Sequence, residues 1–271
     1  MSLAKRLILF ITAVGAFMLL ATVAYFECWS TTRSKWKIAI VTSALGHNYR
    51  TKLLPMFLTS FDRHFFKNDE RTVFVFSDEL IDWPKPWLQQ IQVPFTSDWG
   101  EASMRRWKYL LSLNETLASY DYVVWADVDM IVREPICDNY FAFGRADLIG
   151  VSHPQQAIEN VIHAPFEDRP HSASYVAPEK RKQYLTGSQY AARPAIMQEM
   201  AGYCQKLKEL DASHGLTPRV VDESQYLHYI HYQRWPDAIL SPSYNYPPTE
   251  WEKYEITFGA IPKLIVHGGK G

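Results

Sequence analysis

The stretch Asp121-Tyr-Val-Val-Trp-Ala-Asp-Val-Asp129 decides the fold class of this chain. Its apolar, β-branched part predicts a buried strand, and two carboxylates follow at once. Further strands are predicted at residues 37–43 and 71–77, alternating with helical patterns at residues 49–64 and 101–120. This alternation predicts an α/β fold, with a mostly parallel sheet flanked by helices. In such sheets ligands bind outside the carboxyl ends of strands, which is where Asp127 and Asp129 lie.

The remaining elements follow from the same patterns. Pro194 starts a helix that runs to about Ser213, since proline fits the first helical turn. A shorter helix is expected at 222–233, and strands are expected at 90–95, 186–192 and 263–266.

Charge and composition narrow the class of function. The chain has 271 residues and a net charge of -1, which gives no electrostatic reason to expect a nucleic-acid partner. Aromatic residues make up 14% of the chain; they suit a sugar-binding cleft, where rings stack on apolar sugar faces, and equally an aromatic-rich core. Cys28, Cys137 and Cys204 match no zinc or redox motif, so a Cys137–Cys204 disulfide and free buried thiols both stay open.

The first residues predict a membrane anchor. Lys5 and Arg6 precede an uncharged stretch from Leu7 to Phe26. About 20 residues of helix span the roughly 30 Å of hydrocarbon, and the positive charge favours a cytoplasmic amino terminus. The expected organisation is a cytoplasmic tail (1–6), a transmembrane anchor (7–26), a short stem (27–36) and a catalytic domain (37–271). The alternative is a cleaved signal peptide, which the long apolar run disfavours.

Asp127 and Asp129 are candidate ligands of a divalent cation. One residue apart, they point the same way if the backbone stays extended. Mg²⁺ and Mn²⁺ prefer oxygen ligands and are commonly held by one or two carboxylates together with phosphate oxygens. A solvated turn is the simpler alternative, but the position directly after a buried strand favours the metal.

Several ordered segments carry a resemblance to a known family. They are Phe57-Leu-Thr-Ser60, Trp99-Gly-Glu-Ala-Ser-Met-Arg-Arg106, Asp121 to Met130, His153-Pro154 ahead of Phe166-Glu-Asp-Arg169, Ser172-Ala-Ser-Tyr175, Asp222-Glu-Ser224 and Leu240-Ser-Pro242. Across about residues 37–246 they resemble glycosyltransferase family 6, the family of the blood-group A and B transferases. The resemblance implies a GT-A type fold and a retaining hexosyltransferase.

The resemblance also implies roles for residues on the donor side. Asp127 and Asp129 would hold Mn²⁺, with Asp127 near the donor. Tyr49 would contact the nucleotide, and Arg106 would lie near the donor sugar and its phosphates, where a guanidinium binds oxygens bidentately. Without the resemblance, Arg106 would be interpreted as a surface helix arginine.

Other roles concern the reacting sugar and the acceptor. Glu223 would act at the reacting face of the sugar, covalently or electrostatically, with Asp222 supporting the donor. Thr186, Gly187 and Ser188 would line the donor-sugar pocket. His153 would contact the acceptor. Without the resemblance, the two acids would be explained by a helix start, the segment 186–188 by ordinary strand packing, and His153 by a structural role.

Departures from the family pattern leave the acceptor open. Val220-Val221 replaces the family's Trp-His, and Pro247 replaces an acidic acceptor residue. The family's basic C-terminal tail is missing, and the chain ends His267-Gly-Gly-Lys270-Gly. By a loose likeness to glycogenin-like transferases, His267 is a candidate third Mn²⁺ ligand and Lys270 a candidate diphosphate contact.

Together these points predict a Mn²⁺-dependent transfer of a hexose, galactose or N-acetylgalactosamine being favoured, from a UDP-sugar to a glycan acceptor. The acceptor is a glycolipid, glycoprotein or oligosaccharide, and the implied linkage is α-1,3. The expected location is the Golgi as a single-pass type II protein, with a bacterial or viral-host membrane as the alternative. Two other functions stay open: a glycogenin-like or xyloglucan-type transferase with another donor, and a membrane-tethered glycan-binding pseudoenzyme.

Overall fold

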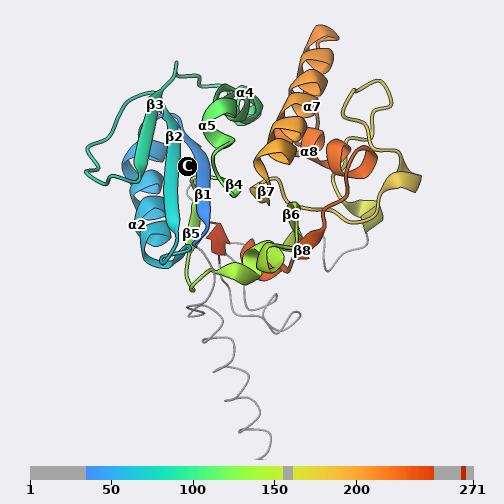
Figure 1. The fold of residues 1–271 in the computed structure, drawn as a ribbon. Coiled ribbons are helices and arrows are strands. Elements are labelled where there is room, and N and C mark those ends of the chain that lie inside the picture. Colours follow the sequence, from blue (N-terminus) through green and yellow to red (C-terminus); the bar gives the residue numbers. More distant parts are fainter. Residues whose placement is uncertain (1–34, 155–160, 247–263, 267–271) are drawn as a thin grey trace, which may run out of the picture.

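The computed structural model describes residues 35–154, 161–246 and 264–266. Within them, seven strands form one sheet in the order β3-β2-β1-β4-β7-β6-β8 (Figure 1). Their bounds are β1 (Lys37–Ala44), β2 (Glu70–Ser77), β3 (Leu88–Gln92), β4 (Tyr122–Ala126), β6 (Leu148–Val151), β7 (Gln189–Ala192) and β8 (Ala238–Leu240). A second, two-stranded sheet pairs β5 (Met130–Val132) with β9 (Leu264–Val266).

The α/β prediction with a mostly parallel sheet is confirmed. Strands β3, β2, β1 and β4 are parallel neighbours, as are β6 and β8. The sheet is mixed, because β7 runs antiparallel to both β4 and β6. Strands β5, β6 and β8 were not predicted from the sequence.

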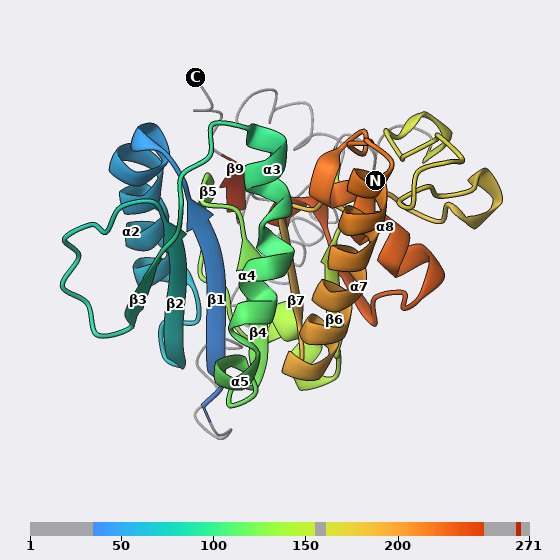
Figure 2. The same cartoon turned by 90° about the horizontal axis from the view of Figure 1, so that it is seen from above.

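Helices cover both faces of the sheet. Alternate residues of β1, β2 and β4 enter two cores: Ile38 and Ile40 pack with α2 (Leu54–His64), whereas Ala39 and Val41 pack with α4 (Arg106–Ser112), α7 (Pro194–Ser213) and α8 (Val221–Tyr232). Figure 2 shows α4 and α7 lying over one face of the sheet. The period-two alternation of strand side chains therefore produces the layered structure.

Two predicted helices are interrupted. The helix expected at 49–64 begins with a π-helical turn, η1 (Tyr49–Leu53), before α2. The helix expected at 101–120 is divided into α3 (Trp99–Met104), α4 and α5 (Asn114–Leu117). At the first break the Ser103 carbonyl accepts a hydrogen bond from Arg106 Nε at 3.2 Å. Short 3₁₀ segments complete the description: η2 (Asp138–Gly144), η3 (Val161–His163), η4 (Pro178–Lys180) and η5 (Pro242–Tyr244).

The predicted helix 194–213 is found with the bounds expected. Two other predictions, the disulfide and the membrane anchor, have different outcomes. Cys204 is a free, buried thiol, so the Cys137–Cys204 disulfide does not form. The candidate anchor at 7–26 lies outside the described residues. Among the helices that are described, none is long and apolar enough to cross a membrane.

Candidate active site

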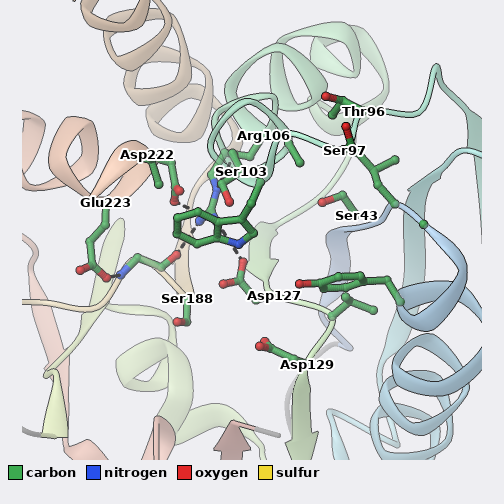
Figure 3. Close-up of a pocket in the computed structure, with 18 of the residues that line it drawn as sticks. Ser43, Thr96, Ser97, Ser103, Arg106, Asp127, Asp129, Ser188, Asp222 and Glu223 are labelled. Atoms are coloured by element: carbon green, nitrogen blue, oxygen red, sulfur yellow. Dashed lines mark hydrogen bonds and ion pairs between the residues drawn. The ribbon is translucent and has the colours of Figure 1, made fainter. Parts of the chain in front are cut away.

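A cleft of about 970 Å³ opens where β1 and β4 end. Because these strands are parallel, the segments after both reach the same edge of the sheet. The antiparallel β7 begins at this edge, where Gln189 pairs with Ala126. Figure 3 shows Asp222, Glu223 and Ser188 on one side of the cleft and Ser43, Thr96 and Ser97 on the other. A volume of this size suits a ligand larger than a single sugar.

Asp127 and Asp129 both line the cleft at the end of β4 (Figure 3). The backbone between them turns, since Met130 N donates to Asp127 O at 3.1 Å. The condition of an extended backbone between the two carboxylates is therefore not met, and both side chains line the cleft from a turn. Asp129 is 3% exposed, whereas the Asp127 side chain is 25% exposed.

Arg106 is buried at the centre of the site. Its Nη2 lies 2.8 Å from Asp222 Oδ2 and 3.1 Å from Asp127 Oδ1, and its Nη1 donates to Gly187 O at 2.6 Å. Burial opposes its charge, but Asp222 and Asp127 outweigh that effect and raise the pKa of Arg106. A surface helix arginine is therefore the wrong interpretation of this residue.

Asp222 and Glu223 occupy the first turn of α8 and line the same cleft. Burial raises the pKa of Asp222 to about 7, although Arg106 acts in the opposite direction. Burial also raises the pKa of Glu223. Glu223 accepts hydrogen bonds from Gly187 N at 2.5 Å and from the Tyr184 hydroxyl, which hold its carboxyl group in place.

The segment 186–188 precedes β7 and approaches α8 closely. A Cβ on Gly187 would lie 3.0 Å from Glu223 Cβ, so only glycine fits here without a shift. Gly187 and Ser188 line the cleft, and Ser188 O accepts from Asp127 N at 2.8 Å. Thr186 is buried outside the lining, and its Oγ1 accepts from Ser188 N at 3.1 Å.

The remaining predicted residues take different places. Tyr49 lines the cleft from η1. His153 lies outside the lining, with its ring edge-on to Tyr184 at 5.6 Å between centroids. His267, Lys270 and Pro247 lie outside the described residues.

Two buried aromatic residues complete the site and were not predicted. Trp125 stacks under the Arg106 guanidinium at 4.7 Å and donates from Nε1 to Asp127 Oδ1 at 2.9 Å. Tyr184 holds Glu223. Trp125 lies in β4 two residues before Asp127, and this period-two spacing was the signal available in the sequence. Tyr184 gave no such signal, because its partner is distant in the chain.

The residues at the end of β4 fit a hard divalent cation. The cleft lining holds four carboxylates, from Asp127, Asp129, Asp222 and Glu223, against two guanidinium groups, from Arg106 and Arg219. No group of three or more His, Cys, Asp or Glu side chains gathers as a metal site within the described ranges. Two carboxylates suffice for Mg²⁺ or Mn²⁺ when a diphosphate supplies further oxygens.

Comparison with known families decides the classification. The model of glycosyltransferase family 6 matches residues 27–255. The chain belongs to glycosyltransferase family 6. The resemblance found in the ordered segments is thereby confirmed.

Three relatives show how far the family likeness extends. The chain is 25% identical over 220 residues to histo-blood group ABO system transferase 2 of Rattus norvegicus, covering 78% of this chain and 63% of the relative. It is 28% identical over 156 residues to the O-antigen biosynthesis glycosyltransferase WbnI of Escherichia coli, covering 58% and 63%. It is 25% identical over 219 residues to globoside alpha-1,3-N-acetylgalactosaminyltransferase 1 of Homo sapiens, covering 76% and 60%. The chain thus spans less than two thirds of the length of each.

Proposed function

We propose that this family member is a metal-dependent glycosyltransferase of GT-A type that moves a hexose from a UDP-sugar to a glycan acceptor. The observation that carries the proposal is the convergence of Asp127, Asp129, Arg106 and Glu223 on one cleft at the end of β4. The names of the relatives support it, since all three are named as transferases.

The charge of the cleft supports metal dependence. A diphosphate is an anion, and here it would meet four carboxylates. The Arg106 guanidinium is already bound to Asp127 and Asp222, and the Arg219 guanidinium pairs with Asp168 at 3.3 Å, so the carboxylates of the lining outweigh the positive charge left for a diphosphate. Asp127 and Asp129 are the residues that would hold a divalent cation, which would stabilise the charge that develops on the leaving diphosphate.

Glu223 is the residue we assign to the reacting sugar. Tyr184 and Gly187 each donate a hydrogen bond to its carboxyl group, so the side chain is preorganised in one rotamer. A fixed carboxylate stabilises an oxocarbenium-like centre, as the second carboxylate of a retaining glycosidase does. Asp222, held by Arg106, is placed to accept a hydrogen bond from a donor-sugar hydroxyl.

The donor and acceptor belong to the same proposal. Gly187 and Ser188 are small, which leaves room for galactose or N-acetylgalactosamine on the donor side, and an α-1,3 linkage follows the family. His153 packs against Tyr184 and remains our candidate acceptor contact. His267 and Lys270 remain candidate metal and diphosphate ligands. Residues 7–26 are proposed to anchor the protein as a type II membrane protein, with the catalytic domain at 37–271.

The test is UDP release by the full chain in detergent, across a panel of UDP-sugars, with Mn²⁺ or with EDTA. We expect slow metal-dependent hydrolysis of one donor and faster release when an acceptor is added. The absence of release with every donor, from a folded protein, would contradict the proposal.

A further inference from the structure

Val221, the residue directly before Asp222 and Glu223, has an unusual backbone conformation. Its φ is +41°, in the left-handed region that β-branched residues rarely adopt. The residue is 6% exposed, so it is packed in this conformation. Strain of this kind persists only where the surrounding structure over-determines it, and it clusters at functional sites.

Glu167 holds the chain just ahead of Val221. It is fully buried, and its Oε2 accepts from Arg219 N at 2.7 Å. The same carboxylate binds Arg169 through Nε at 2.7 Å and Nη2 at 2.7 Å. Arg169 in turn donates to Thr217 O at 2.7 Å. These bonds tie the backbone at 217 and 219 to one buried carboxylate and its arginine partner, which we call the Glu167 clamp.

Contacts on the other side of Val221 complete the restraint. A Cβ on Gly100 would lie 3.3 Å from Val221 Cγ1, so α3 approaches the valine closely. Val220 N donates to Ser224 Oγ at 3.2 Å, and Glu223 N donates to Val220 O at 3.0 Å. The first turn of α8 is therefore restrained by the residues that precede it, by hydrogen bonds within the turn and by contact with α3.

We propose that Glu167 is a positioning residue: its clamp holds Val221 in the left-handed conformation, and this conformation aims Asp222 and Glu223 into the cleft. The inference rests on the proposed function, because it assigns the aim of these two carboxylates to the transfer reaction. Without the clamp, Val221 relaxes toward an unstrained φ, and the first turn of α8 rotates away from Gly187.

The test is a double-mutant cycle with Glu167→Gln and Val221→Gly, read as kcat and KM for UDP release by the full chain. Glutamine keeps one acceptor oxygen but cannot serve both Arg169 and Arg219 N. We expect Glu167→Gln alone to lower kcat about tenfold, with KM for the donor changed less than kcat. Because glycine adopts positive φ freely, the same change in the Val221→Gly background should cost about twofold or less.

A matched control separates the clamp from general loss of charge. Asp168→Asn removes the neighbouring carboxylate, which pairs with the exposed Arg219 side chain at 3.3 Å, and it should leave kcat unchanged. If Glu167→Gln fails to fold, Arg169→Lys weakens the same clamp and takes its place in the cycle. Equal losses in kcat with Val221 present and in the Val221→Gly background would overturn the proposal, because the clamp would then act independently of the strained residue.

Hydrogen exchange distinguishes this proposal from the proposed function. In the full chain, Glu167→Gln should speed exchange of the backbone amides at 219–224, and Asp168→Asn should not. If the unmodified chain releases no UDP from any donor, the proposed function fails, whereas faster exchange would still support the clamp. Unchanged exchange at 219–224 in Glu167→Gln would overturn the clamp itself.

Discussion

Arg106 Nη2 lies 2.8 Å from Asp222 Oδ2, so a side chain at the start of α4 is joined to one at the start of α8. The same nitrogen lies 3.1 Å from Asp127 Oδ1 at the end of β4. Both Arg106 and Asp222 are buried. Three elements that are distant in sequence are thereby held around one guanidinium group.

Arg106→Lys tests this arrangement. A lysine keeps the charge but has one nitrogen, which cannot serve Asp127, Asp222 and Gly187 O together. Loss of a partner from a buried pair costs about 3–5 kcal/mol, and the retained charge should reduce this cost to about 2 kcal/mol of unfolding free energy. We expect kcat/KM for UDP release to fall about 30-fold, which corresponds to a loss of the same size, about 2 kcal/mol, at the transition state.

The neighbouring Arg105 offers the control for Arg106→Lys. Its Nε pairs with Glu101 at 3.2 Å near the surface. Arg105→Lys should change unfolding free energy by less than about 1 kcal/mol and leave kcat/KM unaffected. Similar losses for the two substitutions would contradict a special role for Arg106.

Asp127→Asn and Asp129→Asn test the metal assignment. Each removes a charged oxygen ligand from the end of β4. Loss of a residue that only supports a metal ligand typically weakens metal binding about tenfold or more, so Mn²⁺ binding in the presence of UDP should weaken at least about tenfold here. Isothermal titration calorimetry with Mn²⁺ and UDP measures this directly, without turnover. Asp82→Asn, an exposed change away from the cleft, should bind as the unmodified chain does. Unchanged Mn²⁺ affinity in Asp129→Asn would remove that residue from the ligand set.

Gly187→Ala tests the close approach of segment 186–188 to Glu223. The added Cβ would meet Glu223 Cβ at 3.0 Å, so Glu223 or the segment must shift. We expect kcat to fall at least about tenfold, because Gly187 N then no longer fixes the carboxylate. Gly202→Ala in α7 is the matched control, since its Cβ would meet only Leu111 Cδ2 at 4.0 Å. That change should raise the unfolding free energy by up to about 1 kcal/mol and leave kcat unchanged.

The sequence predicted the parts of the site that follow from local patterns. Asp127 follows a buried strand, and ligands bind at the carboxyl ends of such strands, so its position at the cleft could be predicted from the sequence alone. Arg106 was different, because an arginine within a helical pattern carries no sign of its burial. Its depth depends on Asp222, which is more than a hundred residues away in the chain.

The features of the site that could not be predicted depend on contacts between segments that are distant in the sequence. Tyr184 donates a hydrogen bond to Glu223 in α8, and Glu167 accepts one from Arg219 N just before α8. The spacing of residues in the sequence indicates neither contact. At the break between α3 and α4 the Arg106 side chain donates to the Ser103 carbonyl, a contact that the helical pattern of the sequence does not reveal. The positive φ of Val221 contradicts its intrinsic preference, so only tertiary contacts account for it.

His228 gives the domain a predicted loss of stability in acid. Its ring stacks on Tyr232 at 4.4 Å between centroids, and Tyr203 Oη lies 3.2 Å from its Nδ1. Burial lowers the pKa of His228 to about 4, against the opposing effect of Asp211 and together with that of His231. Between pH 6.5 and 4 the unfolded chain binds a proton that the folded chain does not, so stability falls as the pH falls.

At pH 5 the lowered pKa of His228 should reduce the free energy of unfolding by about 1 kcal/mol, after a reduction for partial exposure to solvent. His228→Phe keeps a flat ring in the stack and cannot titrate. We therefore expect denaturant unfolding of this variant to lose about 1 kcal/mol less than the unmodified chain between about pH 7.5 and about pH 5. Because the comparison is a difference between two pH values, the lost hydrogen bond to Tyr203 cancels. Equal losses in the two proteins would show that His228 becomes protonated without cost in the folded state, contrary to its burial.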